Sequence, residues 1–155
     1  MTRSGADLAL LLLGGFRTLV DEVRAELADR GFPDVRPGHD FAMRAIQAGA
    51  DSASELGRRM SVSKQAAAKT LEILIERGYV AREPDPSDAR RKRLIVTPLG
   101  LDLMRQGEQI FDDLRTRFAT RIGAAELAVL ETQLATLVGD SPIRLEAPGW
   151  AAHTL

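Results

Sequence analysis

Polar side chains suited to the edges of DNA bases follow Ser63. Lys64, Gln65 and Lys69 place two ammonium groups and one amide near the start of a predicted helix, with Ala68 beside them. Gln can pair with adenine through two hydrogen bonds, Lys can donate to guanine or a phosphate, and an alanine methyl can contact a thymine methyl. The bland alternative is an ordinary helical hairpin with a solvated basic face. The residue types favour DNA binding over that alternative.

A second cationic cluster follows Asp88 and consists of Arg90, Arg91, Lys92 and Arg93. Such a run suits phosphates and the negative potential of a narrow minor groove, where Arg inserts readily. Taken alone, it is slightly more typical of a solvated charge cluster on an exposed hairpin. Its position shortly after the first cluster favours the DNA interpretation.

Two short helices position the first cluster. Ser52 and Glu55 have the spacing of a capping box and predict the start of one helix, with Leu56 and Met60 on its apolar face. A three-residue corner, residues 61–63, leads to the second helix, which Ser63 can cap. The buried stripe of this second helix comprises Ala67, Leu71, Leu74, Ile75 and Gly78, and Gly78 also ends it. The arrangement predicts a helix-turn-helix, in which Arg58 and Arg59 of the bracing helix are expected to contact phosphates.

Two strands with a long loop are predicted to position the second cluster. Residues 79–83 and 93–96 have strand composition. Residues 84–92 between them are rich in Pro and Asp, which predicts a loop rather than strand or helix. A helix-turn-helix followed by a hairpin with a basic tip is a winged helix.

Residues 54–100 resemble the core of the MarR family of bacterial transcription regulators. The matching pieces are VSKQA, the Gly-Tyr-Val that ends the second helix, DPSDARRKRL in the wing and the closing VTPLG. The wing motif is the most specific of these. Ala89 departs from the family pattern, which often has a charged residue there, and this predicts fewer wing contacts.

The resemblance implies a homodimer whose winged helices bind a palindromic operator, with release from DNA when a small molecule binds. It makes Asp88 and Arg90 the wing pair, with Arg90 reaching the minor groove. It also implies an effector pocket between the dimerisation helices and the DNA-binding lobe. The candidate lining residues are Phe16, His39, Met43 and Phe111.

The remaining chain is predicted to be mainly α-helical, so the expected fold class is α with a small β-hairpin wing. Helices are expected over residues 7–30, 39–48, 98–121 and 124–138. We expect a single domain over residues 1–155. Residues 7–36 and 98–138 would form its dimerisation helices, residues 38–97 its winged helix-turn-helix lobe and residues 139–155 a tail. Trp150 either anchors that tail or lies exposed on it.

Composition limits the other function classes. The 155 residues contain no cysteine, which excludes disulfides, cysteine–metal sites and a thiol switch. Although the net charge is −1, residues 58–93 hold ten Lys or Arg against five Asp or Glu, and the rest of the chain eleven against seventeen. A basic segment in an acidic body is typical of a local nucleic-acid-binding surface.

No catalytic, cofactor or metal-binding motif is found, and we expect no enzyme activity. His39 is more typical of a helix cap or a surface residue, and His153 lies in the tail. The longest apolar run, Leu8 to Leu13, has six residues, so we expect neither a membrane span nor a signal peptide. We therefore expect the protein to stay in the cytoplasm. Two alternatives to an operator-binding regulator remain: a winged helix that docks onto an acidic protein, and a protein that coats DNA without sequence preference.

Overall fold

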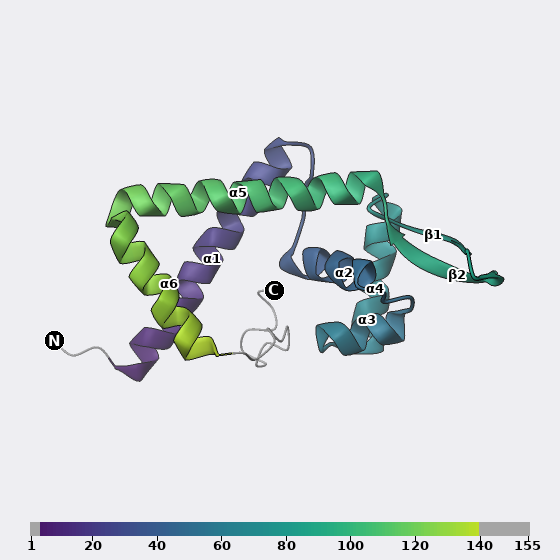
Figure 1. Ribbon diagram of the computed structural model, residues 1–155, viewed down its shortest axis with the longest axis horizontal. Helices are drawn as coiled ribbons and strands as arrows, with labels where there is room; N and C mark the ends of the chain where they lie inside the picture. Colours follow the sequence, from purple (N-terminus) through teal and green to yellow (C-terminus); the bar gives the residue numbers. More distant parts are fainter. Residues whose placement is uncertain (1–3, 140–155) are drawn as a thin grey trace. The chain divides into compact units, whose positions relative to one another are not determined.

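The computed structural model describes residues 4–139, which form helices and one antiparallel hairpin (Figure 1). In chain order the elements are α1 (Gly5–Asp29), α2 (Pro37–Gln47), α3 (Ala53–Met60), α4 (Lys64–Glu76), β1 (Val80–Asp85), β2 (Asp88–Val96), α5 (Pro98–Ile122) and α6 (Ala124–Val138). The expected fold class, mainly α with a small β-hairpin, is confirmed. Within residues 4–139 no helix is both long and apolar enough to cross a membrane.

The described chain divides into two compact units. The helical unit comprises residues 4–35 and 106–139, and the winged-helix unit comprises residues 36–105. The long helix α5 contributes its first residues, up to Arg105, to the winged-helix unit and the rest to the helical unit. Each unit has its own buried side chains.

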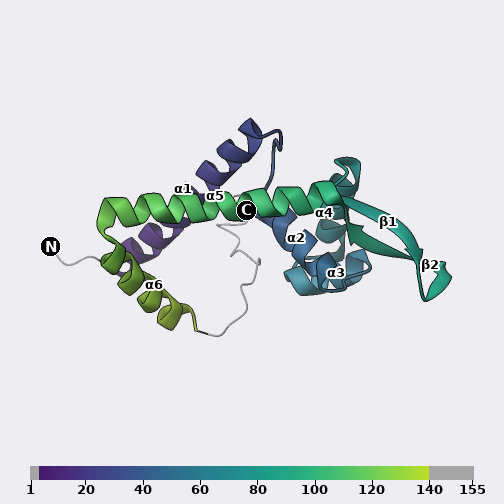
Figure 2. The same cartoon turned by 45° about the horizontal axis from the view of Figure 1, so that its top comes forward.

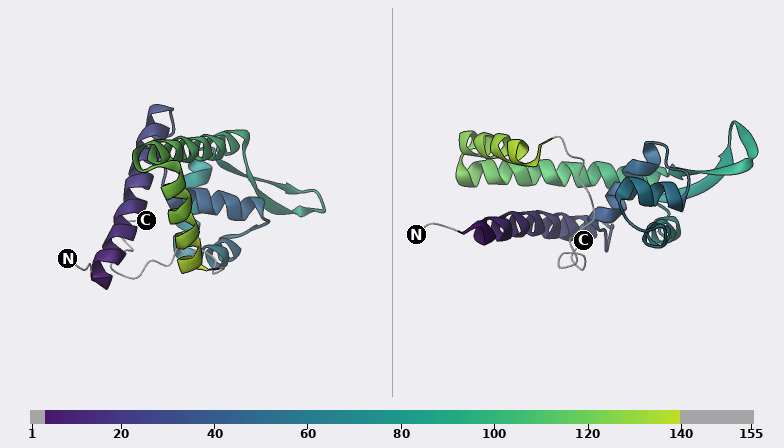
Figure 3. Two further views of the ribbon diagram at one scale, coloured as in Figure 1. Left: turned by 60° about the vertical axis from the view of Figure 1, so that its left-hand side comes forward. Right: turned by 90° about the horizontal axis from the view of Figure 1, so that it is seen from below.

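Helix α5 holds the helical unit together, because its side chains contact both α1 and α6. Ile110 and Leu114 of α5 are fully buried. Arg117 of α5 donates to Glu26 of α1 at 2.8 Å. Arg115 of α5 forms a two-bonded ion pair with Glu131 of α6, at 2.7 and 2.9 Å, and Figure 3 shows α5 and α6 joined by a sharp turn.

Much of the apolar surface of the helical unit is uncovered. On α1 only Val23 and Leu27 are buried, whereas Phe16 remains 43% exposed. The exposed large apolar side chains of this unit are Leu8, Leu10, Leu11, Leu12, Phe16, Phe111, Ile122, Val129, Leu130, Leu137 and Val138. The winged-helix unit exposes only Leu99 and Leu101 among its described residues. Soluble proteins rarely leave such an apolar surface bare unless something binds it.

The winged-helix unit packs α2, α3 and α4 around one core, and its hairpin projects away from them (Figures 1 and 2). One apolar stripe from each helix fills that core, as the helical spacing predicts. Its most deeply buried helical side chains are Ala42, Met43, Leu56, Ala67, Leu71 and Leu74. Val80 and Leu94 extend the core onto the base of the hairpin, which anchors the wing.

The predicted loop over residues 84–92 is wrong, because most of it is strand. Strand β1 continues to Asp85 and β2 begins at Asp88, which leaves only Pro86 and Ser87 as the turn. Pro84 pairs with Lys92 in the register, and the ladder shifts between Pro84 and Asp85. A two-stranded sheet consists of edge strands alone, where a proline costs no hydrogen bond if its nitrogen faces away from the partner. The wing is therefore a longer and stiffer hairpin than its composition indicates.

Candidate nucleic-acid interface

The corner between α3 and α4 is tight and is closed by the backbone. Ser61 adopts a left-handed conformation at φ 53°, and the Val62 N–H donates to the Gly57 oxygen at 2.9 Å. A Cβ atom on Gly57 would lie 3.0 Å from the Val62 oxygen, closer than ordinary packing allows. The absence of a side chain at Gly57 thus lets the two helices meet. Gly57 was not predicted to matter, because its only signal in the sequence is a glycine inside a short helix.

The start of α4 presents the predicted reading residues to solvent. The Ser63 hydroxyl caps the helix by accepting from the Ala66 N–H at 3.1 Å. Ser63, Lys64, Gln65 and Lys69 are exposed and Ala68 is half-buried. The structure therefore brings these five residues together on one accessible end of the helix. Ala66, which was not among the predicted reading residues, is exposed there as well.

Thr97 ties the end of α4 to the base of the wing. Its hydroxyl donates to the Gly78 oxygen at 2.5 Å and accepts from the Gly100 N–H at 3.1 Å. Gly78 takes φ +76°, which favours glycine and turns the chain from α4 into β1. A Cβ atom on Gly100 would lie 2.2 Å from the Tyr79 oxygen, so only glycine fits there. These contacts fix the wing relative to α4.

Two aspartates shape the tip of the wing. The Asp85 carboxylate accepts from the Ser87 N–H at 2.8 Å and from its hydroxyl at 2.6 Å. These hydrogen bonds, the side-chain one above all, hold the pKa of Asp85 below its usual value. The Asp88 carboxylate accepts from the Arg90 N–H at 3.0 Å. Asp88 thereby fixes the backbone at the cationic residue that follows it.

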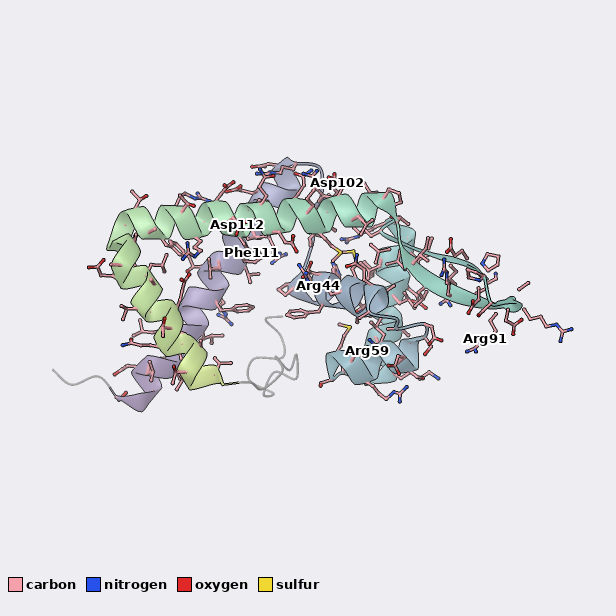
Figure 4. The ribbon with its side chains drawn as sticks, in the orientation of Figure 1. Arg44, Arg59, Arg91, Asp102, Phe111 and Asp112 are labelled. Atoms are coloured by element: carbon pink, nitrogen blue, oxygen red, sulfur yellow. The ribbon has the colours of Figure 1, made fainter. Side chains whose placement is uncertain are left out.

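The wing cations differ in their electrostatic partners. Arg93 is paired with Glu83, its cross-strand partner, at 2.9 and 2.5 Å. Arg91 lies 3.8 Å from Asp51 at the start of the helix-turn-helix, and Figure 4 labels it on the outer part of the wing. Arg90 and Lys92 are exposed, and neither makes an ion pair within residues 4–139.

Three further cations of α4 and the hairpin are exposed and have no ion pair among the described residues. They are Lys64, Lys69 and Arg82. Arg82, on β1, was not selected from the sequence, because strand composition gave no sign of its exposure. Together with Arg90 and Lys92 they form a set of five cations, called the free cations below.

Arg59 of the bracing helix has a structural role. Its Nε donates to Glu55 at 2.8 Å and its Nη1 to the Ala48 oxygen at 2.9 Å, which ties α3 to the end of α2 (Figure 4). Glu55 also pairs with Arg58. The hydrogen bond from Arg59, followed by the charges of Arg58 and Arg59, lowers the pKa of Glu55. Of the expected capping box, the Ser52 hydroxyl accepts from the Glu55 N–H at 3.2 Å, while the Glu55 carboxylate binds these arginines.

The four predicted effector-pocket residues fall in different units. Phe16 and Phe111 belong to the helical unit, where they are 43% and 46% exposed. His39 and Met43 belong to the winged-helix unit and are buried. The His39 Nδ1 accepts from the Arg36 N–H at 3.2 Å, so this histidine caps α2 from a buried position. The pocket itself stays a prediction.

Within residues 4–139, no group of three or more His, Cys, Asp or Glu is placed to hold a metal ion. Trp150 and His153 lie outside the described residues.

A helix-turn-helix with an exposed polar start, followed by an anchored cationic hairpin, defines a winged helix. The model of the MarR family matches residues 42–91, which cover α3, α4 and most of the wing. YcgE of Bacillus subtilis, described as an uncharacterized HTH-type transcriptional regulator, is 40% identical over 53 residues. That match covers 34% of this chain and 33% of YcgE, so the chain spans about a third of this relative's length.

Solved structures extend the likeness to the outer helices. The reduced form of MarR from E. coli has a TM-score of 0.66 and 23% identity, and the match covers 90% of this chain and 99% of that one. The F27L mutant of S. aureus MepR, bound to an oligodeoxyribonucleotide, has a TM-score of 0.57 and 13% identity, with 88% and 97% covered. Residues 42–91 are thus similar to the MarR family, and the described chain has the fold of these MarR-type structures.

Proposed function

We propose that this chain is a homodimeric, sequence-specific DNA-binding regulator that represses transcription from a palindromic operator. One observation carries the proposal. The start of α4 exposes Gln65 together with Lys64 and Lys69, and the hairpin of the same unit exposes Arg82, Arg90 and Lys92. A protein that binds a polyanion and reads its sequence needs both kinds of group.

In the proposed complex, the first two turns of α4 enter the major groove. Gln65 contacts base edges, and Ser63, Lys64, Ala68 and Lys69 contact bases or phosphates around it. The wing reaches the adjacent minor groove through Arg90, whose backbone Asp88 fixes. Lys92 contacts a phosphate, whereas Arg58, Arg91 and Arg93 would each have to leave a carboxylate partner before they could do so. Arg59 supports the bracing helix from behind.

The uncovered apolar surface of the helical unit supports a homodimer. Eleven large apolar side chains of α1, α5 and α6 are exposed in the single chain. A second copy offers the same surface, and burying these side chains against each other follows the isologous pairing typical of twofold dimers. A twofold dimer in turn requires a palindromic site, with half-sites about one helical turn, roughly 34–36 Å, apart.

Release by a small molecule completes the proposal. An effector that binds better to a dimer with wrongly spaced reading helices shifts the population away from the DNA-binding state. Bound repressor then leaves the operator without any change in the reading residues. Phe16, His39, Met43 and Phe111 are the residues whose substitution is expected to alter such a response.

The test is selection of bound duplexes from a random pool, combined with sedimentation of the free protein. We expect a dimer and an enriched inverted repeat with equivalent half-sites. Enrichment of a single, unrepeated site would contradict the homodimeric reading. Binding without any enriched motif would make the protein a DNA-coating protein, and no binding at low salt would favour docking onto an acidic protein.

A further inference from the structure

The reading face of α4 lacks the side chain that most often specifies guanine. Helix α4 has the sequence KQAAAKTLEILIE, without any arginine. Bidentate pairs of Arg or Lys with guanine are the commonest specific contact in the major groove, and α4 offers only Lys64 and Lys69 for them. A lysine is a point charge on a flexible stem that suits a phosphate as well as guanine, whereas the planar fork of arginine is rigid. The helix therefore lacks the side chain that specifies guanine most firmly.

Small apolar groups stand on both sides of the one amide. With roughly 100° per residue, Lys69 lies about 40° from Gln65 around the helix, Ala68 about 60° to one side and Ala66 about 100° to the other. Ala66 is exposed and Ala68 half-buried, whereas Ala67 is fully buried in the core. The Ser63 hydroxyl already accepts a hydrogen bond within the helix cap. Two accessible methyl groups thus flank Gln65.

We propose that the half-site contacted by α4 has an A·T core, recognised through thymine methyl groups as well as an adenine edge. Gln65 binds the N6 and N7 edge of adenine, and the methyls of Ala66 and Ala68 pack on the C5-methyl groups of neighbouring thymines. This inference rests on the proposed function, because it requires α4 to lie in the major groove.

The wing supports the same base composition independently of α4. Arg90 is exposed and has no ion pair among residues 4–139, and its backbone N–H donates to the Asp88 carboxylate. An arginine so presented binds best to a narrow minor groove, which is characteristic of A-tracts. Helix α4 and the wing therefore select for A·T pairs through different grooves.

The test uses the operator obtained by selection, with each thymine replaced in turn by deoxyuridine. This change removes only the C5-methyl group and keeps base pairing. Affinity, measured by fluorescence anisotropy, is expected to fall about fourfold at one or two thymines in each half-site, as for loss of one buried methylene-sized group. Deoxyuridine outside the half-sites should have no effect, which provides the control.

Two variants assign the methyl contacts. In the Ala68→Gly variant, the thymine and deoxyuridine operators should be bound with nearly equal affinity at one of the sensitive positions. In the Ala66→Gly variant, the same should hold at a different sensitive position. Each variant is compared with itself on two DNAs, so any loss of helix stability cancels. If the sensitive thymine responded equally in both variants and the wild type, the alanine contacts would be refuted.

The failures can be told apart. This inference is overturned if the enriched operator has G·C-rich half-sites. It is also overturned if every deoxyuridine operator is bound within twofold of the unmodified one. Either result leaves the proposed function standing. Absence of any duplex binding overturns both.

Discussion

Replacing Arg90 by alanine tests the division between free and paired cations. Counterion release gives a slope of log K against log salt of about −0.9 per phosphate neutralised. Arg90 has no ion pair in the described chain, so its loss removes one full contact per protomer. For a dimer the slope should flatten by about 1.8, and the affinity lost between 50 and 200 mM salt should be about twelvefold smaller than for the wild type. Binding should weaken for all sequences.

Arg93→Ala is the matched control on the same strand. Because Arg93 already pairs with Glu83 at 2.9 and 2.5 Å, contacting a phosphate would first require breaking that pair. We therefore expect a smaller change in slope than for Arg90→Ala. Anisotropy titrations at four or more salt concentrations measure the slopes, and thermal melting verifies that each variant is folded.

The five free cations of each protomer also limit how steep the wild-type slope can be. If each of the ten in the dimer neutralises one phosphate, the slope is about −9.

Two results would refute this reasoning. If Arg90→Ala left both affinity and slope unchanged, the wing would not contact DNA. If Arg93→Ala flattened the slope as much as Arg90→Ala, the cross-strand ion pair would not govern which cations bind phosphate. A wild-type slope steeper than about −9 would likewise show that paired arginines take part.

The remaining predictions concern specificity, packing and pH. Gln65→Ala should reduce discrimination at one base position by about 1–3 kcal/mol, visible as one relaxed column in a repeated selection; an unchanged motif would exclude Gln65 as a base reader. Gly100→Ala should destabilise the fold by about 1–3 kcal/mol, because its Cβ would lie 2.2 Å from a backbone oxygen. Gly107→Ala, with open space around its Cβ, should instead raise the melting temperature, and equal effects of the two changes would contradict the packing argument. Since hydrogen bonds lower the pKa of Asp85, the wing turn should persist above the ordinary Asp pKa of about 3.9 and loosen only as pH falls through the lowered value. The pKa of the Asp85 carboxyl group can be measured by carbon NMR titration, and Ser87→Ala should raise it toward the ordinary value. An ordinary Asp85 pKa in the wild type would contradict the prediction.

Local signals predicted the helices of the winged-helix unit well. Ser63 caps α4 through its hydroxyl, and Gly78 ends it at positive φ, as their positions in the sequence indicate. Thr97 and Pro98 likewise mark the start of α5. Capping and helix termination depend on residues within one turn of each other, so the sequence alone can reveal them.

The wing shows where local signals fail. The composition of residues 84–92 predicts a loop, yet pairing with the opposite strand extends β1 and β2 to a two-residue turn. Ladder hydrogen bonds come from a partner segment, and a window of sequence does not contain that partner. Arg82 was missed for the same reason, because its exposure depends on how the hairpin leaves the core.

The sequence by itself determined which residues carry charge and amide groups, the order of helices and hairpin, and the apolar stripes that build one core. Only the tertiary structure decided which cations are free. The partners of Arg59, Arg91 and Arg93 are the Ala48 oxygen, Asp51 and Glu83, each brought close by folding. A charge can be counted in a sequence, but its availability to a phosphate depends on whether a carboxylate or carbonyl lies within a few ångströms, and chain folding sets that distance.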